Sequence, residues 1–227
     1  MAAFREHIMF STALGAGYGT ALHYGLRLDW PHAAMAGLLC AFAGMLPDLD
    51  SDSGRPGKEI FGFVAMMIPL MLLRRLWRGG VDGEVAILIA VGVYLFIRLV
   101  VVSIFYRLTV HRGMFHSLPA ALIAAETVFL VHDQHGFYDR LFVALGVLLG
   151  FLSHLVLDEI YSVDISGVVP KLKSSAGSAL KLASKSVPAS FVTWVVLGLL
   201  TYAIGVEQGF VKPFHLSVPW LAQATGK

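Results

Sequence analysis

Charged residues and cysteine are both scarce in this sequence. Asp, Glu, Lys and Arg together make up 14% of its 227 residues, whereas an ordinary soluble domain has about one quarter. Hydrophobic residues make up 57%, and the mean hydropathy is +0.74. So little charge is poorly suited to a water-exposed surface, and we predict an all-α, polytopic helical membrane protein in which residues 1–227 form one transmembrane domain.

The single cysteine and the balance of charge exclude two further features. Cys40 has no second cysteine with which to form an intramolecular disulfide, and its apolar neighbours predict a buried thiol. The 17 basic and 15 acidic residues are nearly balanced, and the basic residues are scattered over several loops. The chain therefore lacks the basic patch that nucleic-acid binding requires, and we expect membrane lipids as its environment.

Seven apolar stretches are candidate transmembrane helices, because a helix needs about 20 apolar residues to cross the hydrocarbon core. They cover residues 8–25, 32–47, 60–77, 84–108, 115–132, 139–160 and 188–206, and we expect six or seven spans. The first two are rich in glycine and alanine, which favours close packing inside a bundle. Glu6 and His7 at the start of the first stretch argue against a cleaved signal peptide, so we expect a retained helix.

Two features depart from this pattern of apolar helices. Residues 162–187 are too polar to cross a bilayer, and their lysines are interleaved with Leu and Val. We predict a surface loop or an amphipathic segment there, and a disordered linker rich in Ser, Gly and Lys fits equally well. Glu126 and Arg98 fall well inside two predicted spans. We predict an ion pair between them, since an unpaired charge at that depth costs about 2.5 kcal/mol or more.

Four polar clusters interrupt the apolar sequence, namely REH at 5–7, PDLDSD at 47–52, HRGMFHS at 111–117 and LSHLVLDE at 152–159. Each span reverses the direction of the chain, and counting the spans places all four clusters at one face of the membrane. The same count places the remaining histidines at the opposite face, where we expect ordinary loop or interface residues: His23, His32, His132, His135 and His215.

The spacing inside two of the clusters suits metal ligation. His154 and Asp158 are four residues apart, so a helix presents both side chains from one stripe. His111 and His116 flank Gly113, and a bend at this glycine would turn both rings inward. These four side chains are therefore candidate ligands.

The aspartates of the second cluster complete the candidate ligand set. Asp48 and Asp50 alternate along the chain, so an extended segment would direct both carboxylates to the same side. Imidazole and carboxylate without thiolate suit zinc, manganese, magnesium or iron, and zinc is our first expectation. A site of one divalent ion and a site of two ions are both compatible with these ligands.

The motifs HRGMFHS and GFLSHLVLD, preceded by an early histidine and by LPDLD, resemble those of the YdjM-like family of inner-membrane proteins, assigned as metal-dependent hydrolases. The resemblance covers residues 7–165. Phe115 stands where that family usually has threonine, and Glu6 stands where glycine is common. The resemblance implies a multi-pass protein of the bacterial cytoplasmic membrane that binds metal through His7, Asp48, Asp50, His111, His116, His154 and Asp158.

Together with the resemblance, a metal centre at one face of the membrane leads us to expect a hydrolase that activates water at the boundary of the bilayer. Asp50 or Glu6 could accept the proton, and Arg112 could hold a phosphate or carboxylate oxygen through paired hydrogen bonds. A site at headgroup depth favours an amphiphilic substrate. A phospholipid or polyprenyl phosphate ester fits Arg112 best, and an acyl ester or amide is also compatible.

Two other functions fit the same ligands. A divalent-metal transporter would hold the ion in transit, and a metal-binding structural protein would use it to join helices. Transport predicts further ligands near the bilayer midplane or a continuous polar path, and at the midplane the sequence offers only Glu126 and Arg98. We therefore favour the hydrolase.

Overall fold

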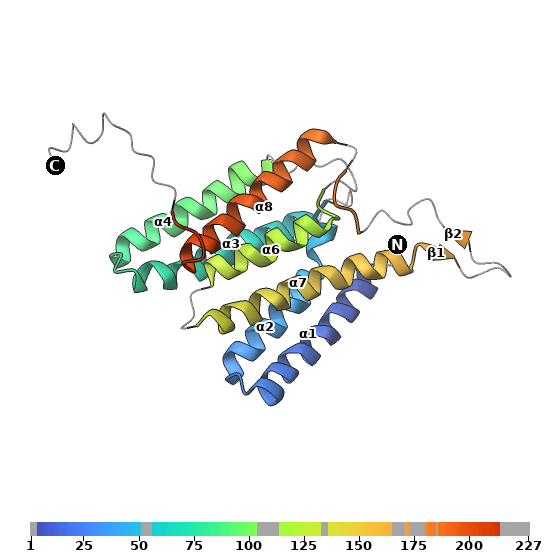
Figure 1. The fold of residues 1–227 in the computed structure, drawn as a ribbon, viewed down its shortest axis with the longest axis horizontal. Coiled ribbons are helices and arrows are strands. Elements are labelled where there is room, and N and C mark those ends of the chain that lie inside the picture. The colour runs from blue at the N-terminus through green and yellow to red at the C-terminus, as the bar shows by residue number, and fades with distance from the viewer. Residues whose placement is uncertain are drawn as a thin grey trace.

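The computed structural model describes residues 4–50, 56–103, 114–132, 136–164, 171–172, 180–184 and 186–213. Within these residues the protein is a bundle of seven α-helices (Figure 1). They are α1 (Phe4–Leu26), α2 (Trp30–Ala43), α3 (Pro56–Arg78), α4 (Gly83–Leu95), α6 (Leu118–Val131), α7 (Phe137–Ile160) and α8 (Val187–Glu207). The 3-10 helix η1 (Leu46–Asp50) follows α2, and the π-helical segment η2 (Phe96–Val101) continues α4. The helices overlap all seven predicted apolar stretches, and the all-helical class is confirmed.

Three helices in the described part of the chain are long and apolar enough to cross a membrane. They cover Gly83–Val101, Phe137–Ile160 and Val187–Glu207, with 19, 24 and 21 residues. The helix at Leu118–Val131 is apolar but shorter. The structure thus supports three spans by length and composition, and the count of six or seven stays a prediction.

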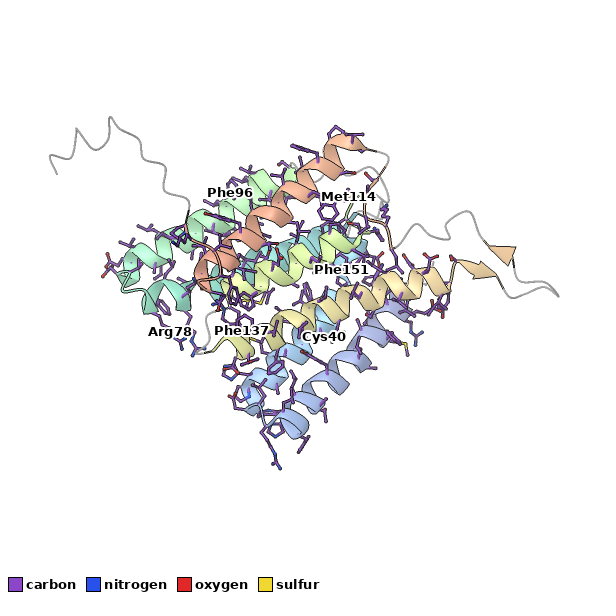
Figure 2. The ribbon with its side chains drawn as sticks, in the orientation of Figure 1. Cys40, Arg78, Phe96, Met114, Phe137 and Phe151 are labelled. Atoms are coloured by element: carbon purple, nitrogen blue, oxygen red, sulfur yellow. The ribbon has the colours of Figure 1, made fainter. Side chains whose placement is uncertain are left out.

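The bundle has two distinct ends. The start of α1, the start of α6 and the end of α7 lie together, and we call this the cluster end (Figure 1). The end of α3 and the start of α7 lie at the opposite end, which we call the far end. Figure 2 shows Met114 at the cluster end and Arg78 and Phe137 at the far end.

Glycines allow α1, α2 and α7 to pack backbone against backbone. A Cβ atom on Gly15 would lie 2.3 Å from Gly37 O, and one on Gly150 would lie 1.9 Å from Cys40 O. Both distances are far below van der Waals contact, so a larger residue does not fit without moving a helix. The close packing predicted from the glycine- and alanine-rich sequence is confirmed, and Cys40 is buried with a free thiol, as predicted.

An arginine network joins four helices at the far end. Arg140 donates to both carboxylate oxygens of Glu207, at 2.9 and 3.1 Å, and its Nε donates to Phe129 O at 2.9 Å. Arg75 Nη2 donates to Glu207 Oε1 at 2.8 Å, and its Nη1 donates to Leu130 O. The network therefore ties the ends of α3, α6 and α8 to the start of α7, and it satisfies carbonyls at the C-terminus of α6.

The predicted ion pair between Glu126 and Arg98 is wrong. Both residues lie in the described part of the chain, and there the Glu126 carboxylate accepts a hydrogen bond from Thr201 Oγ1 at 2.8 Å, without an ion pair to Arg98. The Arg98 guanidinium instead lies beside Gly62, whose hypothetical Cβ would be 3.8 Å from Arg98 Nη1.

The polar segment between α7 and α8 contains short strands where the structure describes it. Strand β1 (Val163–Asp164) pairs antiparallel with β2 (Lys171–Leu172). Leu118 N, at the start of α6, donates to Lys181 O at 3.2 Å. The described part of this segment is thus non-helical and returns to the cluster end. Residues 165–170, 173–179 and 185 of the predicted loop lie outside the described residues.

Candidate metal centre

Five of the seven predicted ligands come together at the cluster end. They form two groups in which one ligand atom of each residue lies within 4.8 Å of the others: His7, His154 and Asp158 in one group, and Asp48, His116 and His154 in the other. Four separate elements supply them, since His7 lies in the first turns of α1, Asp48 in η1, His116 just before α6, and the last two near the end of α7. His154 belongs to both groups.

The other predicted site residues lie outside these groups or outside the described residues. Asp50 ends η1, but its side chain is not described. His111 and Arg112 lie outside the described residues. Glu6 is half-buried and belongs to neither group. The roles predicted for Asp50, Glu6 and Arg112 as proton acceptor or anion holder stay predictions.

A backbone carbonyl sets the orientation and tautomer of His154. Its Nδ1 lies 2.8 Å from Gly44 O, and a carbonyl oxygen can only accept, so Nδ1 carries the hydrogen. Nε2 then carries a lone pair in the ring plane. Metal-ligating histidines commonly donate their other ring N–H to a carbonyl in this way.

Nε2 of His154 faces two carboxylate oxygens. It lies 3.6 Å from Asp48 Oδ1 and 3.8 Å from Asp158 Oδ2, and it has no hydrogen-bond partner in the described part of the chain. The His154 side chain is completely buried, and that of Asp158 is 4% exposed. Hydrogen-bond acceptors that face one another in a buried site are destabilising unless a cation, either a proton or a metal ion, lies between them. Two carboxylates and neutral imidazoles match the charge of a divalent cation, and the mixed nitrogen and oxygen donors suit zinc. These residues therefore fit a divalent metal ion.

Two further imidazoles surround His154. The His7 ring stacks on it, with a centroid distance of 3.6 Å and an interplanar angle of 11°. Nε2 of His7 also lies 3.3 Å from Asp158 Oδ1. The His116 ring is inclined at 64° to that of His154, with centroids 5.6 Å apart. His116 can thus direct its lone pair toward the space that His154 faces.

Close helix packing fixes the positions of these side chains. A Cβ on Gly44 would lie 2.3 Å from the Cβ of Ser11, which is one helical turn after His7 in α1. Gly44 is therefore packed directly against α1. Ser11 Oγ donates to Ala41 O at 2.9 Å and so joins α1 to the end of α2. Ser117 caps the start of α6 by accepting from Ala120 N at 3.3 Å, which fixes the residue after His116. The sequence analysis missed Gly44 and Ser11, and Ser11 could have been found because it lies four residues after His7 on one helix stripe.

The departure at Phe115 has a packing role. Its ring lies 6.2 Å from that of Phe151, measured between centroids, and Phe151 is fully buried on α7 one turn before His154. Phe115 therefore contributes an apolar contact on one side of the cluster, where a threonine hydroxyl would be polar.

The fold and the site together define a class of protein: a helical bundle with helices able to span a membrane and a buried His/Asp cluster at one end. The chain belongs to the YdjM inner membrane protein family, whose family model matches residues 1–222. The comparison with curated proteins and the comparison with solved structures found no match.

Proposed function

We propose that this protein is a metal-dependent hydrolase embedded as a multi-pass protein in the bacterial inner membrane. Its substrate would be amphiphilic, with a lipid phosphoester as the first candidate. The observation that carries this proposal is the buried cluster in which His154 Nε2 faces the carboxylates of Asp48 and Asp158 at 3.6 and 3.8 Å. A purely structural helix contact would have no need of so many ionisable groups in one buried place.

Residues drawn from these two groups would hold the metal ion, with His154, which belongs to both, at their centre. A divalent ion held there would supply a water nucleophile near neutral pH and would polarise a phosphoryl or carbonyl oxygen. The chain's own residues do the rest. The Gly44 carbonyl keeps His154 in one tautomer, and the walls of α1, α2 and α7 exclude bulk water from the buried imidazoles.

Residues beside the cluster are candidates for proton transfer and substrate binding. Glu6 precedes His7 and is half-buried, so its carboxylate can accept a proton from water at the edge of the site. Asp50 follows Asp48 by two residues and is the alternative acceptor. Arg112 would hold a phosphate oxygen through charge-assisted hydrogen bonds.

The depth of the cluster supports an amphiphilic substrate. Asp158 lies two residues, and His154 six residues, before the end of the membrane-spanning candidate α7 at Ile160. With a rise of 1.5 Å per residue, these positions are only about 3 and 9 Å from the end of the helix. If α7 spans the membrane, such a site would lie at headgroup depth, where a lipid can present its ester linkage while its chains stay in the hydrocarbon.

Lipid turnover by the purified protein tests this function. The protein is stripped with a chelator, reloaded with zinc or manganese, and incubated with a panel of phospholipids and polyprenyl phosphates. We expect release of phosphate or headgroup by the wild type and by His32→Ala, a far-end control, and none by His154→Ala or Asp48→Ala. Zinc uptake into proteoliposomes without lipid turnover would instead support the transporter.

A further inference from the structure

We propose that the cluster holds a single ion at His154 Nε2, and that His7 is a positioning residue rather than a ligand. This inference rests on the proposed function only in taking the cluster as a metal centre. In this assignment Asp48 and His116 share the ion with His154, and His7 orients the carboxylate of Asp158.

The stacked rings cannot both bind one ion. An imidazole lone pair lies in the plane of its ring. The rings of His7 and His154 are nearly parallel, and their centroids are 3.6 Å apart. An ion midway between the planes would lie about 1.8 Å out of each, although a zinc–nitrogen bond is only about 2.0–2.1 Å long. Such bonds would point about 60° away from both lone pairs, so an ion in the plane of one ring is out of reach of the other.

His154 can serve only one ion. It is common to both groups of candidate ligands, and Nδ1 is occupied by its hydrogen bond to Gly44 O at 2.8 Å. One nitrogen remains, and it lies 3.6 Å from Asp48 Oδ1. The His116 ring, inclined at 64°, can point to the same space without stacking. The second group is therefore the one whose members can surround an ion, and three protein ligands with an open position are typical of catalytic zinc.

The contacts of His7 indicate a positioning role rather than metal ligation. Its Nε2 lies 3.3 Å from Asp158 Oδ1, and the nearby carboxylate favours the tautomer with the hydrogen on Nε2, although Oδ1 makes no hydrogen bond of good geometry within the described residues. Nδ1 of His7 is then an acceptor, and it is buried without a hydrogen-bond partner in the described part of the chain. By attracting Oδ1, His7 would favour the orientation of the Asp158 carboxylate in which Oδ2 lies 3.8 Å from His154 Nε2. Hydrogen bonds of this kind around a metal typically raise metal affinity about 10–100-fold.

X-ray absorption at the zinc edge, combined with elemental analysis, tests the assignment on the purified full chain. We expect one zinc per chain in the wild type. His7→Phe keeps a flat ring on His154 but removes the donor, so the number of imidazoles bound to zinc stays unchanged while zinc affinity falls about 10–100-fold. His154→Phe lowers the imidazole number by one or abolishes binding. His7→Gln restores part of the affinity, because its amide can donate to Asp158.

Several results would overturn the assignment. They are two zinc ions per chain, a loss of one bound imidazole in His7→Phe, or a His7→Gln variant that binds zinc no better than His7→Phe. If His7→Phe does not fold, the imidazole number in His7→Gln decides in the same way, since glutamine contributes no imidazole. A protein that binds one zinc as described but hydrolyses no lipid would refute the proposed function and leave this inference intact.

Discussion

The substitution Gly150→Ala links helix packing to the metal centre most directly. A methyl group at this position would lie 1.9 Å from Cys40 O and 3.0 Å from Ala43 Cβ. Carbon and oxygen in contact are normally well over 3 Å apart, so α2 and α7 would have to separate by roughly 1.4 Å. Such overpacking costs about 1–3 kcal/mol, and the better helix propensity of alanine offsets about 0.5–1 kcal/mol.

The same separation would disturb His154. Gly44 immediately follows α2, and its carbonyl accepts the hydrogen bond from His154 Nδ1 at 2.8 Å. Moving α2 away would stretch this bond beyond hydrogen-bonding distance and release the ring. We therefore expect Gly150→Ala to lower the melting temperature in detergent by about 2–8 °C and to weaken zinc binding about 10–100-fold.

Gly198→Ala on α8 is the matched control, because nothing lies within 4 Å of a Cβ at that position. It should bind zinc like the wild type and melt at the same or a slightly higher temperature. If Gly150→Ala melted and bound zinc like Gly198→Ala, the argument that backbone contact between α2 and α7 positions His154 would be refuted.

Three further predictions follow from other parts of the structure. Glu207→Gln should lower stability by about 1–3 kcal/mol, because it removes the anion between two guanidinium groups, yet leave zinc stoichiometry unchanged. Glu84→Gln in the exposed first turn of α4 is the control, and reduced zinc content in Glu207→Gln would contradict the expectation that the far end does not affect the metal centre at the cluster end. Ser117→Ala should lower the stability of the fold by about 0.5–2 kcal/mol, because the cap of α6 is lost, and it should weaken zinc binding by releasing His116. Melting and zinc titration measure the two effects, and unchanged zinc affinity would show that the cap does not position this ligand. Removing zinc with a chelator should lower the melting temperature, because at a zinc concentration about 1,000 times the Kd the bound ion should stabilise the fold by about 4 kcal/mol. Identical melting curves with and without chelator would argue against an ion bound to the folded state.

The helices and the order of the polar clusters could be predicted because they follow from composition along the chain. Apolar stretches bounded by polar residues mark helices, and each helix reverses direction, so the sequence predicted which clusters share an end. The rotation of each helix about its own axis could not be predicted in this way. Counting residues along the predicted spans gives Glu126 and Arg98 similar depths, but the Glu126 carboxylate bonds to Thr201, and depth alone gives no information about direction.

The inner geometry of the cluster could not be predicted for a related reason. The hydrogen bond that orients His154 is accepted by the backbone carbonyl of Gly44, and such a contact has no signature in the sequence. The sequence analysis also treated His7 and His154 as equivalent ligands. Only the packing of α1 against α7 shows that their rings lie flat on each other, and this stacking is the basis on which we propose different roles for the two residues.

The zinc content of the purified chain is the measurement that tests the central claim most directly. The wild-type protein, purified without chelator and analysed by inductively coupled plasma mass spectrometry, should contain about one zinc or other divalent transition-metal ion per chain if the cluster is a catalytic metal centre. Under the same conditions His154→Ala should contain almost none. A wild-type protein with no metal above background after incubation with zinc, or a His154→Ala variant with the same metal content as the wild type, would contradict the account.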